Sequence, residues 1–105
     1  MSDTGLTPRE LALITSVLDR AAAVREAILY GSRAKGTYRQ ESDVDLALVG
    51  VDDLQAEAVA EDLEELPLPY RFDVKALERI RHPPLREHIA RVGISLYRRD
   101  APQLP

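Results

Sequence analysis

Two aspartates stand one residue apart in an otherwise apolar stretch, Asp43-Val44-Asp45-Leu46-Ala47-Leu48-Val49. Side chains two residues apart on a strand point the same way, about 6.6 Å apart along the chain at ~3.3 Å per residue. Such carboxylates can bracket divalent ions, and paired ions clamp the attacking and leaving oxygens of a phosphoryl displacement. Hard oxygen ligands favour Mg²⁺ or Mn²⁺ over zinc. The pattern Asp-x-Asp alone is weak evidence for a metal site. Its setting strengthens the interpretation, because aspartate is disfavoured on strands and two adjacent like charges are costly unless a positive group binds between them.

A glycine and a serine, Gly31-Ser32, follow the short apolar run at residues 27–30. A glycine at the end of a strand lets the backbone approach a ligand closely. The serine hydroxyl and the N–H groups of the next turn can then hold a phosphate, and Arg33 and Lys35 add positive charge beside it. The alternative interpretation is an ordinary strand-to-helix turn in which Ser32 is the N-cap.

A third acid, Asp73, lies in the alternating segment Tyr70-Arg71-Phe72-Asp73-Val74-Lys75. Alternation places Asp73 on the polar side, away from Phe72 and Val74. Neighbouring strands lie about 4.8 Å apart, so Asp73 could complete a three-carboxylate cluster with Asp43 and Asp45. The alternative is that Asp73 forms a salt bridge with Arg71, Lys75 or another cation.

The elements that must position these side chains can be read from end signals and periodicity. A helix begins after Thr7, where Thr7-Pro8-Arg9-Glu10 has the pattern of a capping box. A second helix begins at Asp52 and continues until Pro67, and a third is closed by Gly93. The remaining pattern predicts short helical turns at residues 32–35 and 76–81. It also predicts four strands, at residues 27–30, 43–49, 70–75 and 94–98.

This order of elements predicts an α/β (α+β) fold, a small mixed sheet of about four strands with helices packed on it. The directions of the strands cannot be read from the sequence. We expect one domain over residues 1–105, with its core at about 7–99 and a flexible tail at 100–105. The apolar stripe of the first helix, from Leu11 to Ala21, can pack on the sheet or on a second copy, so a homo- or hetero-oligomer is open.

Composition narrows the class of protein. A hydrophobic fraction of 45% in 105 residues is typical of an ordered globular chain. The formal net charge of -4 argues against nucleic-acid binding by the surface as a whole, and the arginines of the last third are expected on solvated helix faces. With no cysteine, disulfides and thiolate metal sites are excluded. No signal peptide or apolar run of ~20 residues is seen, which predicts a cytoplasmic protein without membrane contact.

The spacing Gly31-Ser32, ten intervening residues, then Asp43-Val44-Asp45 resembles the signature of the DNA polymerase beta-like nucleotidyltransferase superfamily. The fuller string through Gly36 and Ser42 is similar to its small prokaryotic branch, the minimal nucleotidyltransferases. Most members have arginine in place of Lys35, which keeps the charge but loses a bidentate donor. The resemblance covers residues 27–98. Within it, 70–74 is similar to the strand that carries the family's third acid, and 89–97 to its closing helix and strand.

The resemblance implies a polymerase beta-like fold with two Mg²⁺ ions and ATP as substrate. Asp43 and Asp45 would bind both ions, and Asp73 one of them, next to the acceptor. Gly31 and Ser32 would hold the β- and γ-phosphates, while an acceptor hydroxyl attacks the α-phosphorus and expels pyrophosphate. Metals and phosphate donors would supply most of the rate by positioning and charge stabilisation.

The resemblance also indicates a partner, because larger relatives add domains that hold the acceptor and this chain has no length for them. Stand-alone members often act as antitoxins to an HEPN-type RNase toxin encoded nearby, adding AMP from ATP to one of its tyrosines. We therefore expect an adenylyltransferase of this kind. Two alternatives stay open: a non-catalytic antitoxin that inhibits its partner by binding, and a nucleotide-sensing module.

Three further residues are open to a functional interpretation. His82 lies in a proline-rich turn and His88 on the buried side of a helix, and both are expected to be structural rather than ligands. Tyr38, between the two halves of the motif, could stack on a base or anchor its loop.

Overall fold

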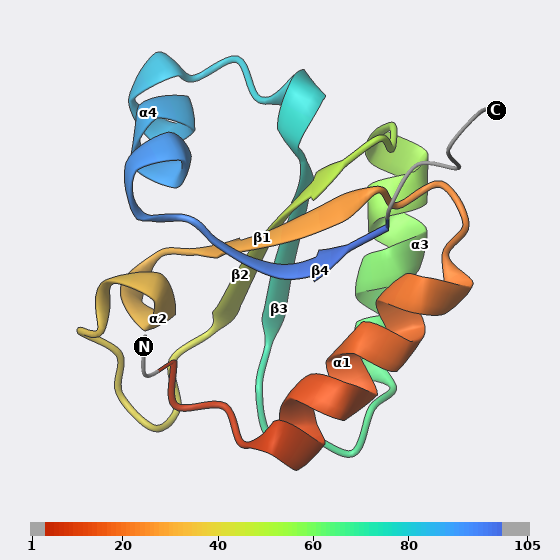
Figure 1. The fold of residues 1–105 in the computed structure, drawn as a ribbon, viewed down its shortest axis with the longest axis vertical. Coiled ribbons are helices and arrows are strands. Elements are labelled where there is room, and N and C mark those ends of the chain that lie inside the picture. The colour runs from red at the N-terminus through yellow and green to blue at the C-terminus, as the bar shows by residue number, and fades with distance from the viewer. Residues whose placement is uncertain (1–3, 100–105) are drawn as a thin grey trace, which may run out of the picture.

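The structure is a computed structural model that describes residues 4–99. Its elements are α1 (Pro8–Arg20), β1 (Glu26–Tyr30), α2 (Ser32–Lys35), β2 (Val44–Val49), α3 (Asp53–Glu64), β3 (Phe72–Ala76), the 3-10 turn η1 (Leu77–Arg79), α4 (Pro83–Val92) and β4 (Ile94–Arg98) (Figure 1). The predicted order of helices and strands is confirmed. The tail expected at residues 100–105 lies outside the described residues.

The predicted capping box of α1 is present, and α3 begins with a second one. At the start of α1, the Thr7 hydroxyl accepts the Glu10 N–H at 3.1 Å, and the Glu10 carboxylate accepts the Thr7 N–H at 2.9 Å. At the start of α3, Asp52 and Gln55 exchange the equivalent bonds at 2.8 and 2.9 Å. These reciprocal bonds satisfy backbone donors that a helix leaves without partners, which is why both helices begin where the sequence predicts.

Several boundaries differ from the prediction by one or two residues, among them the starts of β3 and α4. Strand β3 begins at Phe72 rather than at residue 70, because its pairing with β2 begins with Phe72 opposite Val44. Tyr70 lies before the strand, and its hydroxyl donates to the Glu10 carboxylate, at 3.1 and 3.0 Å from the two oxygens. Helix α4 begins at Pro83, inside the segment expected to separate two helices. Proline is compatible with the first turn of a helix, where the missing N–H is not needed.

The sheet has the strand order β3-β2-β1-β4. β1 pairs antiparallel with β2 and β4, while β2 and β3 are parallel, so the mixed four-stranded sheet is confirmed. In this register Asp45 lies between Tyr30 on β1 and Asp73 on β3. The pairing therefore brings the predicted acids of two strands to neighbouring positions.

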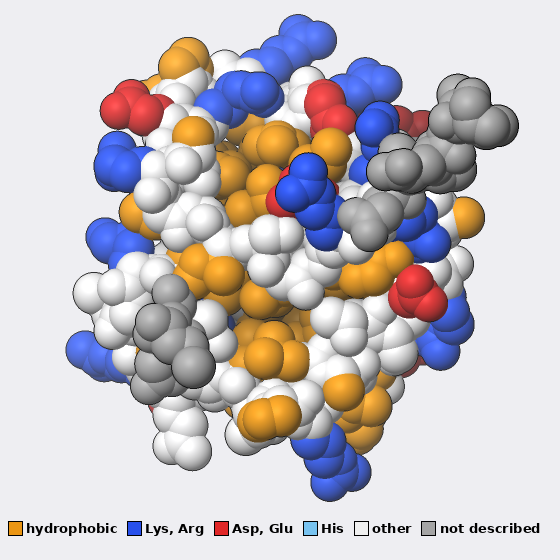
Figure 2. Space-filling view, in the orientation of Figure 1, with side chains coloured by type: hydrophobic (Ala, Val, Ile, Leu, Met, Phe, Trp, Pro, Cys, Tyr) orange, Lys and Arg blue, Asp and Glu red, His pale blue; other side chains and the backbone are white. Residues whose placement is uncertain are grey.

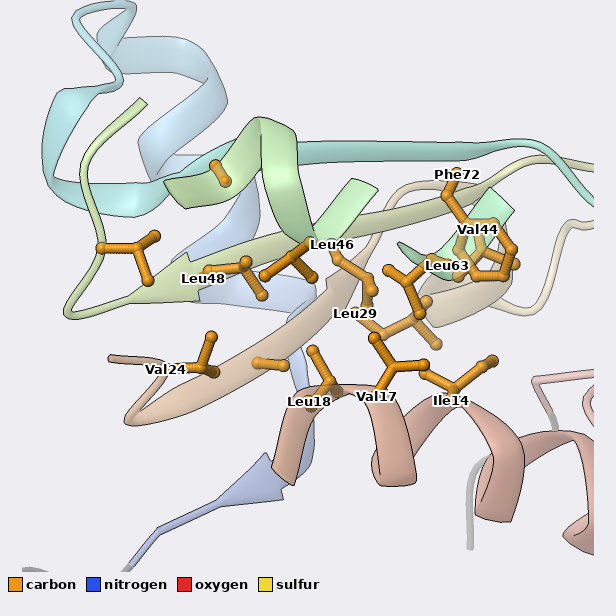
Figure 3. Close-up of a cluster of buried hydrophobic side chains, with 14 of the residues drawn as sticks. Ile14, Val17, Leu18, Val24, Leu29, Val44, Leu46, Leu48, Leu63 and Phe72 are labelled. Atoms are coloured by element: carbon orange, nitrogen blue, oxygen red, sulfur yellow. The ribbon is translucent and has the colours of Figure 1, made fainter. Parts of the chain in front are cut away.

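The two faces of the sheet are covered by different helices. One face packs on α1 and α3, and its central contacts join Ile14, Val17 and Leu18 of α1 to Leu29 and Leu46 of the sheet (Figure 3). The apolar stripe of α1 is thus used within this chain. Figure 1 shows α1 and α3 together at the right of the view, with α4 apart from them at the upper left.

The second face carries the acids and is covered more thinly. Tyr30 and Ala47 pack there against Ile89 of α4. A hollow of about 310 Å³ lies between α4, η1, β1 and β4. Figure 2 shows hydrophobic side chains in this region, with lysines and arginines mostly toward the edge of the view and some near its centre. None of the helices within residues 4–99 is long and apolar enough to cross a membrane.

Candidate active site

Gly31 joins β1 to α2 with a backbone conformation that favours glycine, at φ +77°. Gly31 itself is the N-cap of α2, and no side chain caps this helix, so the alternative with Ser32 as N-cap is wrong. A Cβ atom at Gly31 would collide with Oδ2 of Asp45. The absence of a side chain therefore lets the Asp45 carboxyl group lie directly against the turn.

The three predicted acids lie on the same face of the sheet, on β3, on β2 and just before β2. Asp45 is half-buried, whereas Asp43 and Asp73 are exposed. Burial, followed by repulsion from the Asp73 and Asp43 carboxylates, raises the pKa of Asp45 to about 6, against a smaller opposing effect of Lys75. The acids are thus close enough to influence one another.

Asp73 has a cation beside it. The Lys75 ammonium donates to Oδ1 and Oδ2 of Asp73 at 2.9 and 3.1 Å, so the salt bridge considered as an alternative is present. Within residues 4–99, no group of three or more acids or other ligand side chains stands ready to hold a metal ion as arranged. The expected three-carboxylate cluster is therefore not assembled here.

The chemistry of the donors nevertheless fits a divalent cation. Carboxylate oxygens are the ligands that Mg²⁺ prefers. Lys75 already supplies a positive charge at Asp73, and the repulsion that raises the pKa of Asp45 would be relieved by a cation between the acids. Asp43, Asp45 and Asp73 are accordingly the side chains that would hold the metal.

Arg33 has a different place from the one expected beside a phosphate. Its side chain is 1% exposed, and its guanidinium donates to the carbonyl oxygens of Thr4, Gln40 and Ser42 at 2.9 to 3.2 Å. The guanidinium also lies 4.6 Å from the centre of the Tyr70 ring and 5.3 Å from that of Tyr38. These contacts make Arg33 the residue that holds the loop between the two halves of the motif.

The other members of the phosphate-binding prediction lie at the surface of the turn. Ser32 is half-buried at the first position of α2, and Lys35 is exposed at its last. Tyr38 packs against Arg33, which favours the loop-anchor interpretation. Ser32 and Lys35 are therefore placed where a ligand can reach them.

His88, for which the sequence predicts only a structural role, contacts the candidate site. Its Nε2 accepts the N–H of Gly31 at 3.2 Å, across 57 residues of sequence. Its ring also meets the Tyr30 ring edge to face, with centres 6.2 Å apart. Only the observation that His88 lies on the inner side of α4 could have indicated this, because periodicity does not say which strand a helix covers.

Tyr30 completes the polar groups of this face. It is 5% exposed, and its hydroxyl has no hydrogen-bond partner among the described residues. Burial and the negative charges of Asp73 and Asp45 raise its pKa, so the hydroxyl keeps its proton. A buried donor without an acceptor is uncommon and indicates that a further group belongs in this region.

Comparison with known proteins decides the family. The family model described as "Polymerase beta, Nucleotidyltransferase" matches residues 13–102, most of the chain and every acid of the site. The chain belongs to this nucleotidyltransferase family. Gly31, Asp43, Asp45 and Asp73 are therefore considered below as parts of a family site.

Individual relatives agree with this assignment. The chain is 32% identical over 68 residues to the "Probable protein adenylyltransferase MntA" of Haemophilus influenzae, a match that covers 62% of the chain and 60% of the relative. Among solved structures, a toxin-antitoxin complex with AMP-PNP contains a chain with a TM-score of 0.70, 22% identity, and coverage of 85% of this chain and 73% of that one. A structure assigned as a minimal nucleotidyltransferase has a TM-score of 0.60 and 30% identity, with 79% and 88% covered.

Proposed function

We propose that the protein is an Mg²⁺-dependent adenylyltransferase that moves AMP from ATP to a tyrosine hydroxyl of an HEPN-type toxin. The observation that carries the proposal is the register that sets Asp45 of β2 beside Asp73 of β3, with Gly31 against the Asp45 carboxyl group. The Gly31 turn and the acids thus lie at one end of the sheet, and in the proposal this turn binds the phosphates. The names of the similar proteins, a protein adenylyltransferase and a toxin-antitoxin complex, support the choice of donor and partner.

Each residue of the proposed site has its own role in the reaction. Gly31 and Ser32 bind the β- and γ-phosphates, with Lys35 adding charge. Asp43, Asp45 and Asp73 would hold Mg²⁺, which would supply positive charge to the phosphate oxygens and favour ionisation of the acceptor. The tyrosine oxygen bonds to the α-phosphorus as the bond from that phosphorus to the bridging oxygen of the β-phosphate breaks, and pyrophosphate leaves.

Asp73 is the acid on the acceptor side. It is exposed on an edge strand, whereas Asp45 is half-buried beside the turn that binds the phosphates. We assign the proton of the tyrosine hydroxyl to the Asp73 carboxylate, which releases it to solvent after transfer. In this step Lys75 must give up its contact with Asp73, because a carboxylate held on both oxygens by an ammonium is a weaker base.

A label-transfer experiment tests this function. The protein is incubated with ATP labelled on the α-phosphate, Mg²⁺ and the purified product of the neighbouring gene. We expect label on a tyrosine of that product, and no label with Asp43→Asn, which removes a metal ligand at an exposed position. Absence of transfer, combined with an Asp43→Asn variant that still neutralises the toxin, would disprove the catalytic proposal.

The salt bridge between Lys75 and Asp73 favours a second candidate, a non-catalytic antitoxin that inhibits its partner by binding. A lysine that permanently occupied Asp73 would exclude the metal next to the acceptor. This candidate predicts toxin neutralisation without transfer, in the wild type as well as in Asp43→Asn. A nucleotide-sensing module would instead bind ATP at equilibrium without turnover.

A further inference from the structure

His88 lies at the point where the nucleotide motif begins. Helix α4 carries the imidazole across the second face of the sheet, and Nε2 accepts the N–H of Gly31 at 3.2 Å. Accepting at Nε2 places the single proton of a neutral imidazole on Nδ1. His88 therefore satisfies the backbone donor of the motif glycine and keeps an N–H of its own.

The position that Nε2 occupies is the position that a phosphate oxygen would need. A backbone N–H has one hydrogen, so an imidazole nitrogen and a phosphate oxygen cannot both take a strong bond from Gly31. Gly31 has no side chain of its own, and the Asp45 carboxyl group lies against the place where its Cβ would be. His88 is accordingly the side chain that a phosphate arriving at this N–H would meet.

A second observation on the same face also points to a missing ligand group. Tyr30 contacts the His88 ring, and its buried hydroxyl has no hydrogen-bond partner among residues 4–99. Asp45, the strand neighbour of Tyr30, lies against the same turn. The Tyr30 hydroxyl is therefore a buried donor without an acceptor beside the Gly31 turn.

We propose that His88 is a phosphate-binding residue of the nucleotide site. Its Nε2 accepts the Gly31 N–H at the place that a phosphate oxygen would take. When the triphosphate binds, a phosphate oxygen accepts that N–H, and the imidazole turns and donates its Nδ1–H to the same phosphate group. This inference rests on the proposed function, because it assigns a further contact to the same triphosphate.

Two substitutions separate this role from a purely structural one. In His88→Gln the side-chain carbonyl can accept the Gly31 N–H, and after a flip the amide can donate to a phosphate. In His88→Glu the carboxylate is of nearly the same size and can accept the Gly31 N–H, but it cannot donate and it repels a phosphate. Repulsion alone would weaken binding by Glu in either case, so the variants are interpreted together with the imidazole itself. A purely structural role predicts that the His88 resonances do not respond to nucleotide, whereas a phosphate-binding role predicts that they do and that only Gln replaces His88.

The measurement is calorimetric binding of AMP-PNP in the presence of Mg²⁺. We expect His88→Gln to bind within about threefold of the wild type and His88→Glu to bind at least about tenfold more weakly, the loss expected for one hydrogen bond to a charged group. His82→Gln and His82→Glu are the matched controls, since His82 is exposed and makes no side-chain cap bond at the start of α4. Both controls should bind like the wild type.

A spectroscopic measurement follows the imidazole directly. Addition of AMP-PNP should move the ¹⁵N resonances of His88 as Nε2 loses the Gly31 N–H, and should leave those of His82 in place. Melting temperatures of both His88 variants establish that each is folded before binding is interpreted; if His88→Glu does not fold, the ¹⁵N shifts in the wild type decide alone. Equal binding by folded His88→Gln and His88→Glu, or unchanged His88 resonances, would overturn the inference. A wild type that binds no nucleotide would instead refute the proposed function.

Discussion

Replacing Arg33 by methionine tests the role that the structure assigns to this residue. Methionine keeps the unbranched length of the side chain but has no donor for the surrounding carbonyl groups. Arg33 donates four hydrogen bonds to three carbonyl oxygens, at 2.9 to 3.2 Å, and is 1% exposed. The substitution therefore leaves carbonyl groups of the N-terminal segment and of the loop at residues 40–42 without their donor.

The size of the effect follows from these contacts. A hydrogen bond to a charged group contributes about 1.5–3 kcal/mol, but bonds to one guanidinium are not additive. Gln40 is exposed, so water can replace part of its bond, whereas the buried Thr4 depends on Arg33 more strongly. We expect Arg33→Met to lower the free energy of unfolding by about 3 kcal/mol, a large part of the roughly 5–15 kcal/mol of a typical domain.

Urea denaturation followed by circular dichroism measures this change. Lys35→Met is the matched control, because it removes a positive charge from the same short helix at an exposed position and should change stability by less than about 0.5 kcal/mol. Arg33→Lys, which keeps the charge but cannot reach several carbonyl groups at once, should lie between the two. An Arg33→Met protein within about 1 kcal/mol of the wild type would refute the structural role.

Two further predictions concern the acids and the glycine turn. In metal-free protein the pKa of Asp45 is raised to about 6, so the folded state binds a proton at this carboxyl group more readily than the unfolded state does. The stability that protonated Asp45 contributes is therefore present at low pH and is lost as pH rises from about 4 through 6. Asp45→Asn should therefore melt at a higher temperature than the wild type at pH 7.5 and at a similar one at about pH 3.5, below the unfolded pKa; a difference that is the same at both pH values would contradict this. Gly31→Ala and Gly36→Ala both place alanine at positive φ, but only residue 31 would collide with Asp45, since nothing lies within 4 Å of a Cβ at residue 36. We expect Gly36→Ala to cost about 1 kcal/mol in stability and to retain AMP-PNP binding, and Gly31→Ala to lose that binding; equal binding by the two variants would disprove the close approach of turn and acid.

The parts of the fold that could be predicted depend on local chemistry. A capping box involves residues three apart, so Thr7 with Glu10 and Asp52 with Gln55 can be recognised from the sequence and are found as expected. Alternation likewise placed Asp45 and Asp73 on the polar face of their strands, because side chains on a strand alternate whatever their neighbours are.

The parts that could not be predicted depend on contacts between distant segments. No local pattern indicates that β2 lies between β1 and β3, and this order alone brings Asp45 next to Asp73. The contact of His88 with Gly31 joins residues 57 positions apart, and it depends on the face of the sheet that α4 covers. Resemblance to a known family supplied the missing pairing for the acids, but it carried no information about His88.

The role of Arg33 was misjudged for a physical reason. A cation next to a phosphate-binding turn is expected to contact phosphate, and arginine is mostly exposed in proteins. Here the loop between the halves of the motif folds over Arg33, and three of its surrounding carbonyl groups compete successfully for the guanidinium. Sequence alone does not show where a polar loop folds back on the chain.

The central claim, adenylyl transfer to a tyrosine of a partner, is tested most directly by mass spectrometry of that partner. The purified product of the neighbouring gene is treated with ATP, Mg²⁺ and either the wild type or Asp45→Asn, and modified residues are mapped. We expect one or more adenylyl groups on tyrosine with the wild type and none with Asp45→Asn. A partner whose mass stays unchanged with wild-type protein that binds AMP-PNP and neutralises the toxin would contradict it.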